Sequence, residues 1–276
     1  MPELPEVETI ARTLKEQILG RRIDSLEVPG PKVLQAGTDL LPALPGSTVT
    51  DIHRRAKLLL MRLSGKADLI LAFHFKMTGR FFVYPANTPA TKHTRLILNL
   101  DGGERLFFDD MRTFGYCRIM RPADLAAWTF YAALGPEPLE LAPEDLAVCL
   151  QNAFHGRKIS VKAALLDQRN VAGIGNIYAD EALFQAGIAP QRPASSLNPA
   201  QLRALAGALR EILLRSIAEC GSSIRDYRDA FGRAGAFQNS FSVYGRGGQN
   251  CLSCGKTLKS ARIAGRGTVY CPLCQK

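Results

Sequence analysis

Four cysteines near the C-terminus constrain the fold of this chain more than any other feature of its sequence. Cys251 and Cys254 form one Cys-x2-Cys pair, Cys271 and Cys274 form a second, and sixteen residues separate the pairs. This spacing is typical of two knuckles that hold four thiolates around one Zn²⁺. Four protein ligands leave no coordination position for a substrate, so we expect one structural zinc ion that stabilises a small C-terminal hairpin.

Basic residues concentrate in the second half of the chain. The 276 residues include 35 Lys and Arg against 25 Asp and Glu, a formal net charge of +10, and the whole excess lies in residues 151–276. Because Lys and Arg displace condensed counterions from phosphates, this asymmetry favours a polyanionic partner. A basic surface that binds no ligand is the alternative.

No segment of the sequence suits a membrane or a secretion pathway. The longest apolar runs, such as residues 69–73, are far too short to span a bilayer. The N-terminus opens with Pro2, Glu3 and Pro5, without the basic head and apolar stretch of a secretion signal. We therefore expect a cytoplasmic protein that has no membrane contact.

Residues 1–133 are expected to form an N-terminal β-sandwich domain that begins with a helix. Apolar residues recur at helical spacing over residues 5–18. Short apolar runs between Gly and Pro turns then continue to about residue 121, which is typical of an antiparallel β sandwich or barrel. The clearest predicted strands cover residues 58–63, 69–75, 81–84, 96–100 and 106–109. Two prolines and a glycine within residues 134–142 predict a linker.

The pattern beyond this linker is helical. Helices are predicted over residues 143–154, 160–168, 176–186 and 199–219. Residues 221–240 lack periodicity and contain three glycines, which predicts a loop. We assign residues 143–240 to a helical domain that includes this loop, and residues 241–276 to the four-cysteine tail. The fold class is therefore α+β and multidomain.

Two glycines and an asparagine mark a joint between two of the predicted helices. Gly173 and Gly175 permit tight turns, and Asn176 is suited to the start of the next helix. The amides at that helix N-terminus could bind a phosphate. An ordinary helical hairpin explains the same residues.

Pro2 is a candidate nucleophile. Its small side chain allows removal of Met1, which would expose a secondary amine that titrates near 8. Condensation of this amine with the anomeric carbon of a sugar gives an iminium, and elimination of a phosphate can follow. Glu3, Glu6 and Glu8 lie close by in sequence and could protonate a departing group. The alternatives are an ordinary N-terminal proline and acidic residues that offset a helix dipole.

Four ordered blocks of sequence closely resemble bacterial formamidopyrimidine-DNA glycosylases. They are residues 1–9 (Met-Pro-Glu-Leu-Pro-Glu-Val-Glu-Thr), 173–178 (Gly-Ile-Gly-Asn-Ile-Tyr), 243–246 (Val-Tyr-Gly-Arg) and the four-cysteine motif. The resemblance spans the whole chain and implies a helix-two-turn-helix DNA-binding domain with a lesion-recognition loop and a zinc finger.

The resemblance also implies an activity. It is that of a bifunctional DNA glycosylase and AP lyase of base excision repair, which excises 8-oxoguanine and formamidopyrimidines through a proline Schiff base and then performs β,δ-elimination. The implied partner is double-stranded DNA with oxidised bases or abasic sites. The implied protein is a monomer in the bacterial cytoplasm, associated with the nucleoid through DNA.

Catalytic roles follow from the same resemblance. Pro2 would be the nucleophile, Glu3 the acid that protonates the opening sugar, and Glu6 an assisting carboxylate. Lys57 matches a strand lysine near the scissile phosphates. Arg266 matches the zinc-hairpin arginine associated with phosphate binding and the second elimination.

The resemblance places DNA contacts at His93, Arg112, Lys158, Lys162, Asn176, Met77 and Phe114. Met77, Arg112 and Phe114 match a trio that fills the hole left by an extruded base. Sandwich core is the alternative for Met77 and Phe114. Members of the resembled family often have a second arginine at the position of Thr113. This difference concerns only a secondary contact, since Arg112 and Phe114 are present.

Two rival functions come from different classes. A sister family that removes oxidised pyrimidines has a similar Pro-Glu start, but Leu4 and the Val-Glu-Thr of residues 7–9 look more like the purine branch. A zinc-ribbon nucleic-acid binder without catalysis would be expected to have lost Pro2 or Glu3, and both are present.

Overall fold

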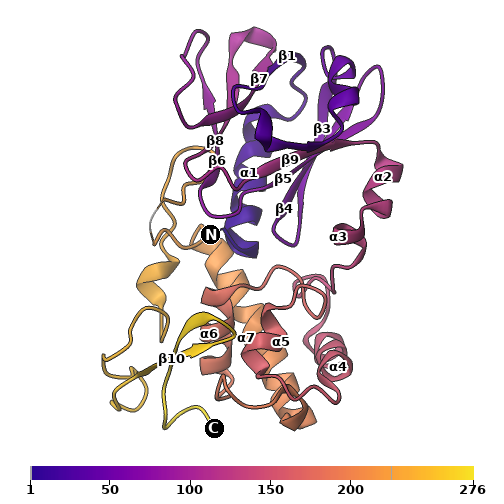
Figure 1. Ribbon diagram of the computed structural model, residues 1–276. Helices are drawn as coiled ribbons and strands as arrows, with labels where there is room; N and C mark the ends of the chain where they lie inside the picture. The colour runs from indigo at the N-terminus through magenta and orange to yellow at the C-terminus, as the bar shows by residue number, and fades with distance from the viewer. Residues whose placement is uncertain (1, 225) are drawn as a thin grey trace. The chain divides into compact units, whose positions relative to one another are not determined.

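The computed structural model describes residues 2–224 and 226–276, which form two compact units (Figure 1). The first unit contains the residues up to Ala132 together with residues 220–236. The second contains Ala133–Glu219 and Phe237–Lys276. No helix among the described residues is long and apolar enough to cross a bilayer.

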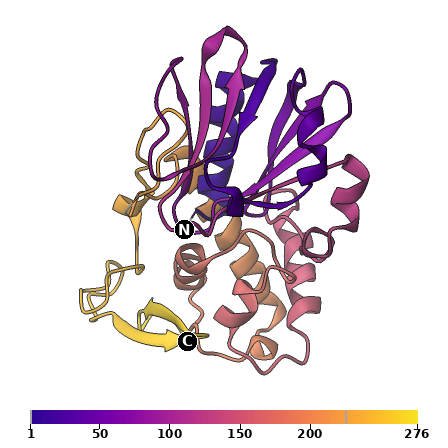
Figure 2. The same ribbon diagram turned by 45° about the horizontal axis from the view of Figure 1, so that its top comes forward.

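Helix α1 (Leu4–Ile18) opens the first unit and confirms the helix expected over residues 5–18. Pro5 lies in its first turn, where the missing N–H costs no hydrogen bond. Val7, Leu14 and Ile18 are each 0% exposed, so the apolar stripe of the helix is fully buried. The helix packs against strands of both sheets (Figure 2).

Two sheets form the sandwich that the sequence predicted. The four-stranded sheet has the order β1 (Ile23–Glu27), β7 (Thr94–Leu100), β8 (Arg105–Asp110) and β6 (Gly79–Tyr84). The five-stranded sheet has the order β2 (Leu34–Ala36), β9 (Tyr116–Met120), β5 (Leu69–His74), β4 (Leu58–Ser64) and β3 (Thr48–Arg55). All pairings are antiparallel except that of β2 with β9, which departs from the purely antiparallel expectation.

Aromatic rings fill the centre of this sandwich. Phe73 lies 4.8 Å from Phe81 and 5.3 Å from Phe108, measured between ring centroids, and Phe75 lies 5.6 Å from Phe81. All four rings are buried. Tilted and edge-to-face contacts of this kind add to the hydrophobic stabilisation of the core.

Several short elements complete the first unit and its connection to the second. They are the 3₁₀ turns η1 (Pro31–Val33), η2 (Thr38–Ala43) and η3 (Asp101–Gly103) and the helices α2 (Pro122–Ala127) and α3 (Thr129–Ala132). The sequence did not indicate α2 or α3, because each is too short to show a periodic apolar pattern. Leu125 of α2 packs with Trp128 on a second small core of the five-stranded sheet.

The four main helices of the second unit match the predicted ones. They are α4 (Pro143–Phe154), α5 (Val161–Leu166), α6 (Asn176–Gln185) and α7 (Pro199–Ala218). Helix α5 ends two residues early because the side-chain amide of Gln168 donates to the carbonyls of Leu166 and Ile174, which turns the chain. The 3₁₀ turns η4 (Ala194–Ser196) and η5 (Phe237–Ser240) also belong to this unit.

Strands β10 (Lys259–Ile263) and β11 (Arg266–Tyr270) form the C-terminal hairpin. Its two-residue turn consists of Ala264 and Gly265, both with positive φ. Positive φ at both positions gives the turn a backbone twist that matches the right-handed twist of the two strands. Arg266 therefore directly follows the turn.

Residues 220–236 correct the predicted domain division. The sequence-based division joined them to the helical domain, whereas in the structure they pack with the first unit. Ser222 N donates to Glu6 Oε1 at 2.8 Å, and Ala230 N donates to Thr13 Oγ1 at 3.2 Å. These partners lie more than 200 residues away in sequence, so local sequence pattern could not reveal them.

Candidate functional site

The first group of candidate residues lies at the N-terminus of α1. Pro2, Glu3 and Glu6 are all buried. Glu6 Oε2 accepts a hydrogen bond from Glu3 N at 2.9 Å, and Glu6 Oε1 accepts from Ser222 N. The carboxylate of Glu6 thus fixes the backbone of Glu3 and the start of loop 220–236 at the same time.

Glu8 lies between two guanidinium groups. Arg12 Nε lies 2.7 Å from Glu8 Oε1, and Arg54 Nε lies 2.9 Å from Glu8 Oε2. Burial raises the pKa of Glu8, but the two guanidinium groups outweigh it and hold that pKa below its ordinary value. Glu8 is therefore ionised near neutral pH and unsuited to donate a proton.

Arg54 connects Lys57 to the same helix. Its guanidinium bridges Glu8 on α1 and the carbonyl of Ala56, in the turn between β3 and β4. Lys57 is the next residue of that turn and is 8% exposed. The sequence analysis did not single out Arg54. The sequence alone cannot distinguish a buried arginine that bridges two elements from an exposed arginine in a strand.

The three residues that would fill the hole left by an extruded base, here called the wedge residues, lie on two neighbouring loops of the first unit; they are Met77, Arg112 and Phe114. Met77 is 40% exposed and Phe114 is 53% exposed, so neither belongs to the sandwich core. The guanidinium carbon of Arg112 lies 4.9 Å from the centre of the Phe114 ring. His93, on a third loop, is half-buried, and its carbonyl accepts from Asp110 N at 2.9 Å. The alternative of core packing for Met77 and Phe114 is excluded.

The second group of candidates lies around the C-terminal hairpin in the second unit. Arg266 is exposed, and the neighbouring carbonyl of Gly267 accepts from Asn176 Nδ2 at 2.9 Å. Asn176 is the first residue of α6, so the glycine-rich joint and the hairpin turn meet here. Lys158 is exposed on the segment between α4 and α5.

Lys162 contradicts its predicted role as a phosphate contact. Its side chain is 0% exposed, and Nζ lies 2.6 Å from Asp180 Oδ1. Nζ also donates to Thr268 Oγ1 at 2.7 Å and to the Gly267 carbonyl at 3.1 Å. A side chain without exposed surface cannot touch DNA. Lys162 instead connects α5 and α6 to the hairpin that carries Arg266.

Glu181 is a further structural residue that the sequence analysis missed. Its carboxylate accepts three backbone hydrogen bonds, from Ser242, Val243 and Tyr244, at 2.7–2.9 Å. Val243 is 0% exposed and packs in the small core of the four-cysteine tail. The Val-Tyr-Gly-Arg block is therefore a structural connection between α6 and the tail.

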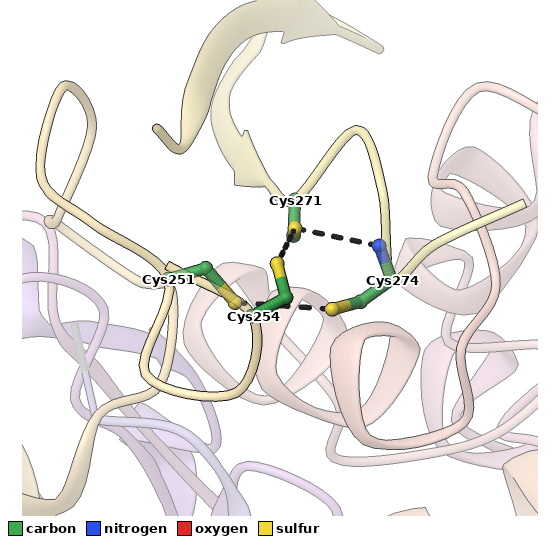
Figure 3. A group of neighbouring side chains, drawn as sticks. All are labelled: Cys251, Cys254, Cys271 and Cys274. Carbon is green, nitrogen blue, oxygen red and sulfur yellow. Dashed lines mark hydrogen bonds between the residues drawn. The ribbon is translucent and has the colours of Figure 1, made fainter. Parts of the chain in front are cut away.

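The four cysteine thiols converge on one point (Figure 3). All four ligand atoms lie within 4.8 Å of one another. Cys251 Sγ lies 3.9 Å from Cys274 Sγ, and Cys254 Sγ lies 3.5 Å from Cys271 Sγ. Thiolates about 2.3 Å from a tetrahedral zinc are about 3.8 Å apart, so these two separations fit thiolates that share one Zn²⁺. The amide of Cys274 also donates to Cys271 Sγ.

Three family models match the chain along its length. They are the formamidopyrimidine-DNA glycosylase N-terminal domain over residues 1–117, the formamidopyrimidine-DNA glycosylase H2TH domain over residues 134–228, and the zinc finger found in FPG and IleRS over residues 248–276. The β sandwich, the helices and the four-cysteine hairpin thus define a zinc-finger protein of the H2TH class.

Curated relatives and solved structures narrow this class to one family. The chain is 42% identical to formamidopyrimidine-DNA glycosylase of Nitratidesulfovibrio vulgaris and 45% identical to that of Desulfitobacterium hafniense, with 100% of each chain covered. The structure is similar to the wild-type Lactococcus lactis Fpg bound to DNA containing N7-benzyl-Fapy-dG, with a TM-score of 0.90, 34% identity and 100% of both chains covered. The Lactococcus lactis complex with abasic-site DNA also gives 0.90 and 34%, with 99% of each chain covered. The chain belongs to the formamidopyrimidine-DNA glycosylase family.

Family membership confirms the resemblance, the fold class and the single structural zinc. The zinc-finger model and the geometry of the four thiols support that zinc independently. The metal holds the hairpin folded and supplies no chemistry, because its four positions are filled by protein ligands.

Proposed function

We propose that this chain is a bifunctional DNA glycosylase and AP lyase of base excision repair that removes 8-oxoguanine and formamidopyrimidines from double-stranded DNA. The observation that carries the proposal is that Pro2 and Glu3 lie buried side by side in the sequence of a member of this family. The carboxylate of Glu6 holds the backbone N–H of Glu3. The solved relatives that bind Fapy-dG or abasic-site DNA support the choice of substrate. We further propose a monomer that works on DNA in the cytoplasm, at the nucleoid.

Pro2 and Glu3 would carry the first half of the reaction. After removal of Met1, the Pro2 amine forms a bond to C1′ of the damaged nucleotide, and the bond from C1′ to the base breaks. The base leaves with the electron pair and takes up a proton, and the Pro2 nitrogen gives up its N–H proton, which frees its lone pair. Glu3 protonates the ring oxygen as the sugar opens, which gives an iminium between Pro2 and C1′. Of the first three glutamates, Glu8 is excluded from this role by its guanidinium partners.

The iminium makes strand cleavage possible. It withdraws electrons, so loss of a proton from C2′ expels the 3′ phosphate, and loss of a proton from C4′ expels the 5′ phosphate. Lys57 and Arg266 would stabilise the negative charge of these leaving groups. Glu6 would act by positioning Glu3.

The remaining candidates would bind the duplex. Four of them would contact the sugar-phosphate backbone of the DNA: His93, Arg112, Lys158 and Asn176. Met77, Arg112 and Phe114 would occupy the hole left by the extruded nucleotide, which their exposure permits. The lesion-recognition loop, residues 221–238, would cover the extruded base, and its residues up to Ala236 belong to the first unit.

The test is release of the damaged base from three matched duplexes. We expect rapid release and strand cleavage with 8-oxoguanine or a formamidopyrimidine, and slow release with thymine glycol. Faster release of thymine glycol would contradict the proposal in favour of the oxidised-pyrimidine branch. Binding without release from any duplex would favour a non-catalytic binder.

A further inference from the structure

We propose that Thr78 and Asp110 are positioning residues that fix the spacing between Met77 on one loop and Arg112 and Phe114 on the other, and thereby set how strongly the protein prefers damaged over intact DNA. The inference rests on the proposed function. It concerns two side chains that the reaction itself does not use.

Asp110 stands at the end of β8, and its carboxylate is completely buried. Its Oδ2 accepts from Gly115 N at 2.7 Å, and its Oδ1 accepts from Arg112 N at 3.2 Å. The loop of residues 111–115 therefore closes around this one carboxylate. A buried charge is stable only when it is hydrogen-bonded in this way, so the loop conformation and the carboxylate stabilise each other.

Thr78 extends the same network to the other loop. Its hydroxyl donates to Asp110 Oδ1 and accepts from Arg112 N, the latter at 3.0 Å. Thr78 directly follows Met77. One hydroxyl group thus ties the backbone that carries Met77 to the backbone that carries Arg112.

Both loops are otherwise tightly constrained. Lys76 and Thr113 have positive φ values of 50° and 58°, which few non-glycine residues adopt. A Cβ at Gly79 would lie 2.7 Å from the carbonyl oxygen of Phe75, and a Cβ at Gly115 would lie 3.0 Å from the Phe108 ring. Such strain persists only where the surroundings enforce it, and it is common at functional sites.

Asp110 reaches a third loop through its backbone. Its N–H donates to the carbonyl of His93 at 2.9 Å, and its carbonyl accepts from Arg95 Nε at 2.9 Å. The candidate phosphate contact at His93 and the two wedge loops therefore share one buried anchor. Asp110 therefore fixes the positions of three loops relative to one another, namely the two wedge loops and the loop that carries His93.

The wedge side chains themselves cannot supply that arrangement. Met77 and Phe114 are 40% and 53% exposed, so core packing does not determine their spacing. A wedge lowers the free energy of the complex only when its parts fit a hole of one nucleotide, which exists in the extruded state alone. Loss of the Thr78 hydroxyl should therefore weaken lesion binding and leave nonspecific binding intact.

The experiment compares Thr78→Val, Thr78→Ser and the matched control Thr88→Val in the full chain. Thr88 donates its hydroxyl to the Pro85 carbonyl at another turn. Affinity is measured for a duplex with a tetrahydrofuran abasic analogue and for the same duplex undamaged. We expect Thr78→Val to lower the preference for the analogue about fivefold to tenfold. Thr78→Ser and Thr88→Val should keep the wild-type preference, and the salt dependence should not change in any variant.

A second background tests whether Thr78 acts through the wedge. In Met77→Ala/Phe114→Ala, the added Thr78→Val change should cost much less than in the wild-type protein, because only Arg112 of the three wedge residues remains. Asp110→Asn, which keeps the size of the side chain, should reproduce the loss if Thr78→Val proves too unstable to measure. Wild-type preference in Thr78→Val or Asp110→Asn, or an equal loss in the double-alanine background, would overturn the inference. Absence of lesion preference in the unmodified protein would instead overturn the proposed function.

Discussion

Glu3→Gln is expected to abolish base release while binding to damaged duplex stays nearly unchanged. The substitution removes a proton donor and preserves the size of the side chain, and general acid catalysis contributes about 10²–10⁴-fold to a rate. The measurement is single-turnover release of 8-oxoguanine, together with affinity for the same duplex.

Glu8→Gln is the matched control for this change. Glu8 lies in α1, five residues after Glu3, and is held in ion pairs with Arg12 and Arg54. We expect its release rate to stay within a fewfold of the wild-type rate. If Glu3→Gln and Glu8→Gln were equally active, the acid role of Glu3 would be refuted.

Lys162→Ala is expected to cost about 3–5 kcal/mol in the free energy of unfolding, because it leaves the buried carboxylate of Asp180 without its counter-charge. The same change also removes the hydrogen bonds from Nζ to Thr268 and Gly267. Denaturant unfolding measures the loss. The matched control is Lys158→Ala, an exposed lysine of the same unit, which should change stability by less than about 0.5 kcal/mol.

Asp180 gives the Lys162→Ala variant a characteristic pH dependence. Burial raises the pKa of Asp180 to about 6, and Lys162 opposes that rise, so the variant should have a still higher value. The folded variant then retains a proton that the unfolded chain releases near pH 4. Its stability should therefore fall as the pH rises from about 4 up to the raised pKa. Because that pKa lies above the wild-type value, the deficit relative to the wild type should be larger at about pH 8 than at about pH 5. A pH-independent deficit, or none, would mean that the two side chains do not form a buried pair.

Local sequence signals predicted α1 and the four main helices of the second unit well, but not the short α2 and α3. Proline near the start and a capping residue mark the beginning of α7, where Asn198 accepts from Gln201 N. The strands were predicted as a class, but the parallel pairing of β2 with β9 was not. Pairing depends on contacts between segments some 80 residues apart, which a single sequence does not show.

The candidate site shows the same difference between residues predicted from local sequence and residues whose role depends on distant partners. The zinc ligands followed from spacing alone, and their thiols do converge. Lys162 was assigned wrongly because its burial depends on Asp180 and Thr268, the latter 106 residues away. Likewise, the contact between Glu6 and loop 220–236 is invisible in the sequence. The sequence can identify candidate site residues, but only their burial and hydrogen-bond partners in the structure show which of these residues can reach solvent or substrate.

Pro2 is the proposed nucleophile, and reductive trapping tests this role most directly. The protein is incubated with an 8-oxoguanine duplex and borohydride, which reduces an iminium to a stable covalent bond. We expect one DNA strand bound per chain, located at the Pro2 nitrogen by mass spectrometry of the digested complex, and much less trapping with a thymine-glycol duplex. DNA attached to a lysine, or no trapped complex despite base release, would contradict the account.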